Sequence, residues 1–139
     1  MFLETNDFKE TIKAEILDDV LDGEPDALEE ADAHAVELVG SYLNGLYDTV
    51  AIFDATGVDR HKTIVALVMD IALYRLHFRI NPRQIPDIRR IAYEDALALL
   101  KAIQKRESNP VGLPPAIDDE GNEQSISRFG GNTKMNHRW

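Results

Sequence analysis

Histidine and carboxylate side chains are the residues of this chain best suited to metal binding or acid–base chemistry. The four histidines fall in different segments: His34, His61, His77 and His137. Glu30 lies one helical turn before His34, while Asp70, Tyr74 and His77 share one stripe of a helix. Neither arrangement matches the repeated Glu-x-x-His pairs of helical metal sites. We therefore expect no metal site, and we expect Asp70 to be a buried or half-buried acid held by an arginine or by the Tyr74 hydroxyl.

Signatures of nucleophilic and cofactor-dependent catalysis are also missing from the sequence. It contains no cysteine, no Gly-x-Ser-x-Gly elbow and no phosphate-binding loop, and its one Gly-Gly pair is Gly130–Gly131. The neighbouring acids Glu94 and Asp95 would project about 100° apart on a helix, so they cannot cooperate as an acid/base pair. We therefore predict a protein that is not an enzyme and that uses no cofactor.

Charge is distributed unevenly along the 139 residues. The net charge is −10, but residues 1–54 carry −13 and residues 60–106 carry +6. Five arginines make up a basic cluster in the second region: Arg75, Arg79, Arg83, Arg89 and Arg90. So acidic a molecule would repel nucleic-acid phosphates, and we expect these arginines to form salt bridges within the chain or between copies of it. The sequence also lacks an apolar run long enough to cross a membrane.

The composition divides the chain near residue 107. Residues 1–106 hold 53 of the 61 apolar residues, whereas residues 107–139 hold only 8, together with half of the glycines and prolines. The first part can build a hydrophobic core and the second part cannot. We therefore predict two regions: a helical bundle domain at residues 1–106 and an extended C-terminal docking arm at residues 107–139.

Apolar residues recur at helical spacing in the first region and predict an all-α bundle of about four main helices. These helices should cover about residues 6–21, 26–46, 60–81 and 86–103. The first should bury one stripe: Phe8, Ile12, Ile16 and Val20. A short turn through "TVAIFDATG" should follow the second. The third is apolar on two sides, including Leu67, Ile71 and Phe78, and should be central. The fourth should bury a stripe that begins at Ile88.

Several short strings occur in order from residue 40 onward: "SYLNGLYD", "IFDATG", "DIALYRLHFRINPRQIPDIR", "YEDALALLK" and "RFGGNTKMNHRW". Together they resemble the small neck proteins of Mu-like prophages. That family in turn resembles the head–tail connector, or adaptor, proteins of tailed phages. The relatives place an arginine before "YEDA", where this chain has Ala92.

The resemblance implies a structural role in the virion neck, with the host cytoplasm as the place of assembly. Its expected partners are the portal protein, other neck or tail-completion proteins, and further copies of the chain in a ring of roughly twelvefold symmetry. DNA would pass through the lumen without specific binding. In such a ring, the five arginines of the basic cluster are expected at the contacts between copies. The alternative is a small DNA-binding or DNA-packaging accessory protein of a phage.

The end of the chain combines aromatic, basic and glycine residues in a segment that cannot pack them itself. Aromatic and arginine side chains dominate interface hot spots, so we expect residues 107–139 to become ordered on the portal or on a neighbouring subunit. The expected anchors are Arg128, Phe129 and Trp139. Surrounding them, the expected contributors are Gly130, Gly131, Asn132, Lys134, Asn136, His137 and Arg138.

Overall fold

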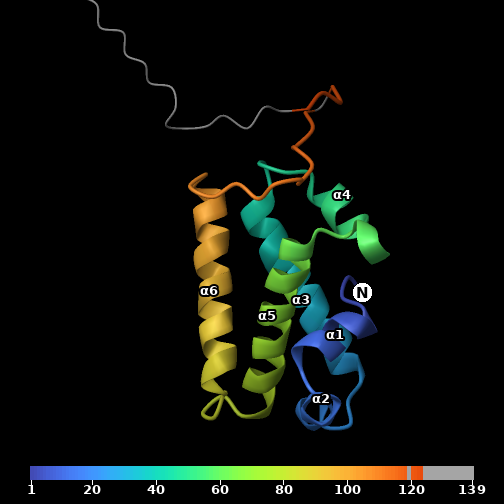
Figure 1. The fold of residues 1–139 in the computed structure, drawn as a ribbon, viewed down its shortest axis with the longest axis vertical. Coiled ribbons are helices and arrows are strands. Elements are labelled where there is room, and N and C mark those ends of the chain that lie inside the picture. Colours follow the sequence, from blue (N-terminus) through green and yellow to red (C-terminus); the bar gives the residue numbers. More distant parts are fainter. Residues whose placement is uncertain (119, 124–139) are drawn as a thin grey trace, which may run out of the picture.

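The computed structural model describes residues 1–118 and 120–123, and these residues form an all-helical fold. The elements are α1 (Thr5–Thr11), α2 (Ala14–Leu21), α3 (Asp26–Leu43), α4 (Thr49–Asp54), the 3-10 helix η1 (Gly57–Asp59), α5 (Lys62–Ile80) and α6 (Asp87–Gln104). The long helices α3, α5 and α6 pack together, and the short α1, α2 and α4 lie on the side away from α6 (Figure 1). The all-α class expected from the sequence is confirmed.

Helix α5 is the centre of the bundle, as its two apolar stripes predicted. It contacts α1, α2, α3 and α6. Leu67 and Ile71 are buried, and Val68 and Ala72 on its second stripe are fully buried. Helix α5 ends at Ile80, two residues before Pro82. That ending agrees with the low helical preference of a residue that precedes proline.

The single first helix expected over residues 6–21 is wrong, because two helices with a break between them replace it. Ile12 is extended, with φ −142° and ψ 143°, and its N–H donates to the Phe8 carbonyl. The break turns Ile12 into the core, where it is buried beside Phe8. It also rotates α2, so Ile16 is left 44% exposed while Val20 is buried.

Two further differences from the sequence expectations concern local packing. The segment expected as a turn at "TVAIFDATG" contains α4, whose first turn is capped by the Asp48 carboxylate accepting from the Ala51 N–H at 3.1 Å. Ile88, expected in the core, is 70% exposed. Ile88 and Ala96 are eight residues apart, and eight residues of an α-helix make two full turns plus about 80°. Ile88 therefore points about 80° away from the buried Ala96 around the helix axis.

The N-terminal segment is held to α3 by a buried carboxylate. Asp32 is only 3% exposed, and it accepts hydrogen bonds from the N–H groups of Phe2 at 2.9 Å and Leu3 at 2.8 Å. Phe2 and Leu3 are themselves buried, and the Phe2 ring packs edge-on against Phe53. These two hydrogen bonds therefore satisfy backbone donors that burial would otherwise leave without an acceptor.

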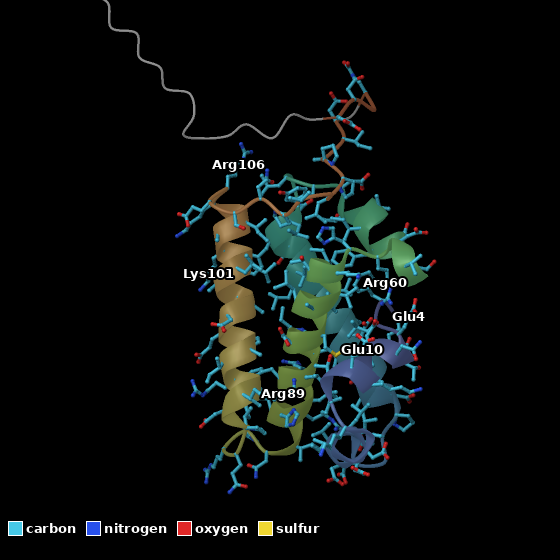
Figure 2. The ribbon with its side chains drawn as sticks, viewed as in Figure 1. Glu4, Glu10, Arg60, Arg89, Lys101 and Arg106 are labelled. Atoms are coloured by element: carbon cyan, nitrogen blue, oxygen red, sulfur yellow. The ribbon has the colours of Figure 1, made fainter. Side chains whose placement is uncertain are left out.

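Arg60 holds the same segment from the other side, next to η1. Its guanidinium donates to the Phe2 carbonyl at 3.0 Å and to the Asp7 carboxylate at 2.6 and 3.2 Å, and lies 3.3 Å from the Glu4 carboxylate (Figure 2). Burial alone raises the pKa of Asp7, but the hydrogen bonds from Arg60 and from the Glu4 N–H, with the charge of Arg60, outweigh it. The pKa of Asp7 is therefore lowered.

The packed part of the chain continues beyond residue 106, where composition placed the domain boundary. The Asp48 N–H donates to the Pro114 carbonyl at 2.9 Å, and the Tyr47 hydroxyl bonds to Asn109. Leu113 and Ala116 are buried against the bundle. This part of the predicted arm therefore packs over the α3–α4 end of the bundle.

Replacing Asp32 by alanine should lower the free energy of unfolding by about 1–3 kcal/mol for each of the two buried N–H groups left without an acceptor. Denaturant unfolding monitored by circular dichroism measures this change. Glu37→Ala is the matched control, because Glu37 is an exposed acid on the same helix. Its loss should change stability by less than about 0.5 kcal/mol. Equal effects of the two substitutions would show that the Asp32 hydrogen bonds do not stabilise the fold.

Candidate functional site

The histidines of the described region have separate local roles. His61 Nε2 lies 2.7 Å from the Val111 carbonyl, and His77 Nδ1 lies 2.8 Å from the Leu73 carbonyl of its own helix. Across residues 1–118 and 120–123, no cluster of three or more His, Cys, Asp or Glu side chains could hold a metal ion. In the same residues no helix is long and apolar enough to cross a membrane. His137 lies outside the described residues.

A groove of about 750 Å³ runs between α1, η1 and the first half of α5. We call it the α1–α5 groove. Val58, Val65 and Met69 give it an apolar lining, and Val58 is 99% exposed. The acids that line it are Asp7, Glu10 and Asp70, and the cations are Arg60 and Lys62. Because Arg60 is already paired with Glu4 and Asp7, the lining groups that have no ion pair with the described residues are Glu10, Asp70 and Lys62.

Asp70 is the half-buried acid of this groove. Its carboxylate forms no hydrogen bond or ion pair with the described residues, so the direct bond that the sequence suggested, from an arginine or from Tyr74, is not formed there; the charge of Arg89 still acts on it. Burial raises the pKa of Asp70; the Arg89 charge opposes the change and the Asp95 charge adds to it. The nearby Arg89 instead donates to the Thr11 carbonyl at 3.0 Å, across the α1 side of the bundle (Figure 2).

A second, smaller groove lies between α3, α5 and α6, where two adjoining cavities of about 230 and 120 Å³ share His34, Arg75 and Phe78. Tyr74 on α5 stacks on Tyr93 of α6 with ring centroids 4.0 Å apart. Phe78, expected on a buried stripe, is 46% exposed there. The aromatic stack fixes the angle between the two helices while leaving the space next to Phe78 open.

The five arginines of the basic cluster differ in how they are engaged within the chain. Arg79 pairs with Glu24, and Arg89 bonds to a backbone carbonyl. Arg90 pairs with Asp87 and Glu94 on its own helix, at 3.5 and 3.2 Å. Arg75 and Arg83 form no ion pair with the residues that the structure describes. Part of the cluster is thus used inside the chain and part remains available at the surface.

All of the expected docking residues of the C-terminal arm lie outside the described residues. They are Arg128, Phe129, Gly130, Gly131, Asn132, Lys134, Asn136, His137, Arg138 and Trp139. The described chain up to Glu123 leaves the bundle at the α3–α4 end (Figure 1). The arm therefore begins at the end of the bundle opposite to the α5–α6 turn.

Sequence reasoning missed the α1–α5 groove, because the groove exists only where the N-terminal segment is folded back onto α5. No motif marks Glu10 or Val58 as surface-lining residues. The one available signal was Asp70, the one acid of α5 and a residue between apolar neighbours.

Comparisons with protein-family models, curated proteins and solved structures found no match to this chain.

Replacing Asp70 by asparagine should raise the free energy of unfolding at neutral pH. Burial gives Asp70 a higher pKa in the folded than in the unfolded protein, so the folded protein loses stability as the pH rises from the unfolded-state pKa through the folded-state pKa. Asparagine cannot ionise and so avoids this loss. The gain should shrink toward zero as the pH falls toward the ordinary Asp pKa of about 3.9. Urea titrations at several pH values measure it, with the exposed Asp18→Asn as control. A destabilised Asp70→Asn protein at neutral pH would contradict the assignment.

Proposed function

We propose that this chain is a structural phage protein, a head–tail connector that forms a ring between the portal and the tail. The observation that carries the proposal is the ordered set of strings from "SYLNGLYD" to "RFGGNTKMNHRW", which resembles the neck proteins of Mu-like prophages. No single string is specific, but their order along the chain is. In this proposal the C-terminal arm docks on the portal or on a neighbouring subunit.

The separation of charge between helices supports the proposal. The exposed acids Glu15, Asp18 and Asp19 lie on α2, whereas Arg83 and Arg90 lie at or next to the start of α6. A closed ring needs a heterologous contact, in which one face of a copy meets a different face of the next. Surfaces of opposite charge provide two such faces and disfavour contacts between like faces.

The acidic half of the chain also suits a channel through which DNA moves. A lumen wall that attracted phosphates would hold DNA by charge, whereas an acidic wall lets it pass. The alternative function, a DNA-binding or packaging accessory protein, draws its support from the basic cluster. Arg79 and Arg90 are already paired with acids of the same chain, and this favours the connector.

Deleting residues 125–139 should abolish docking onto the portal and leave the thermal midpoint of the bundle unchanged. The core residues identified in the structure all precede residue 117, so the deletion removes none of them. Co-purification with the portal and calorimetry of the free protein measure the two effects. The control is a chain of full length with residues 125–139 in scrambled order. Infectious particles assembled with the truncated protein would contradict a docking role for the arm.

The purified protein should bind duplex DNA no better than an unrelated protein of similar negative charge at physiological salt. Phosphate contacts dominate such affinity, and a chain of net charge −10 offers few of them. A mobility-shift titration over a range of salt concentrations measures it. Sub-micromolar binding that weakens steeply with salt would instead favour the packaging accessory protein.

A further inference from the structure

The start of α6 carries an apolar surface that no part of the described chain covers. Ile88 is 70% exposed and Ile91 is 49% exposed, one turn apart on the same side of the helix. Arg83, in the preceding turn, has no ion pair with the described residues. Exposed isoleucines at a helix start, preceded by an arginine without an ion pair in the described part of the chain, are typical of an interface with an acidic and apolar partner.

The α1–α5 groove has the complementary properties. Val65 and Met69 offer it an apolar floor, Val58 lies exposed in its lining, and Glu10 and Asp70 form no ion pair within residues 1–118 and 120–123. Asp70 is half-buried, and a second cation brought beside it, in addition to the Arg89 charge of its own copy, would further offset the cost of burying its charge. The sole opposing unpaired charge of the groove lining in the described residues is Lys62.

We propose that the α1–α5 groove of one copy receives the start of α6 from a second copy. Ile88 and Ile91 of the second copy cover Val58 and the apolar floor, and Arg83 lies close to Glu10 and Asp70. The inference rests on the proposed function, since a ring requires a contact between two different faces of identical subunits. It identifies those two faces within the fold.

In a pair joined in this way, the first copy still offers its α6 start and the second copy still offers its groove to further neighbours. Association therefore continues from copy to copy until the ring closes, and a symmetric dimer does not satisfy it. Arg83 and Glu10 determine which surfaces meet, and the isoleucines supply the buried apolar area. A partner protein other than a second copy, or a nucleic acid, would not pair these two surfaces with each other.

Disulfide formation between single-cysteine variants tests the contact, because the chain has no cysteine of its own. One variant carries Ile88→Cys and the other, with an affinity tag, carries Val58→Cys. Mild oxidation of the purified mixture at high concentration should yield the tagged heterodimer. The matched control replaces Val58→Cys by Val111→Cys, since Val111 is 91% exposed and lies outside the groove. No heterodimer, or equal yields from both mixtures, would overturn the proposal.

Charge reversal tests the same contact without a covalent bond. Glu10→Lys and Arg83→Glu should each weaken self-association about tenfold or more, as measured by sedimentation over a range of concentrations. Mixing the two variants should restore it, because the altered α6 start of one then meets the altered groove of the other. Unchanged association of either variant would overturn the proposal. A mixture that self-associates as weakly as either variant alone would also overturn the proposal.

Neither experiment requires the portal or a phage particle, so the contact and the proposed function can fail separately. If the disulfide fails while the protein still binds the portal, the contact is wrong and the connector function stands. If the disulfide forms while portal binding and particle assembly do not depend on the chain, the contact stands. The protein is then a self-associating protein with a different role.

Discussion

The clamp on the N-terminal segment is the interaction on which the rest of the surface depends. Asp32 accepts the backbone N–H groups of Phe2 and Leu3, while Arg60 binds the Phe2 carbonyl and the acids Glu4 and Asp7. Neither contact is local, because about thirty and about fifty-five residues of sequence separate the partners. Together they fold α1 back along α5. Without them the α1–α5 groove would lose its outer wall, although α3, α5 and α6 would keep their shared core.

The clamp also decides which charges of the acidic half remain available. Asp32, Glu4 and Asp7 bind groups of their own chain and so help to hold the fold. A buried charge stabilises a protein only when such partners offset the cost of removing it from water. Glu10 and the exposed acids of α2, such as Asp18 and Asp19, have no ion pair in the described chain. The negative charge of this half therefore divides into a structural set and a surface set. Only the surface set can contribute to recognition between proteins.

The sequence predicted the long helices well because their signals are local. The apolar stripes of α5, the stop before Pro82 and the start of α6 near Pro86 all follow from spacing and proline stereochemistry. The break at Ile12 was not predictable in this way, since a regular four-residue spacing hides an extended residue that turns into the core. The Asp32 and Arg60 contacts join residues far apart in sequence, so no periodicity could indicate them. The α1–α5 groove depends on these same contacts, so no periodicity could indicate it either.

The exposed Ile88 and Ile91 bear both on the sequence predictions and on the surface of the bundle. Periodicity placed Ile88 in a core, yet the turn of α6 carries it away from the buried Ala96 in a single copy. Exposed apolar side chains that gather on one face mark a candidate surface for contacts with other proteins. Val58 is also uncovered, and it lines the same groove as the half-buried Asp70, which has no ion pair with the described residues. The start of α6 and the α1–α5 groove are thus two uncovered surfaces of opposite charge on one bundle, and in the contact that we propose each covers the other in an adjacent copy.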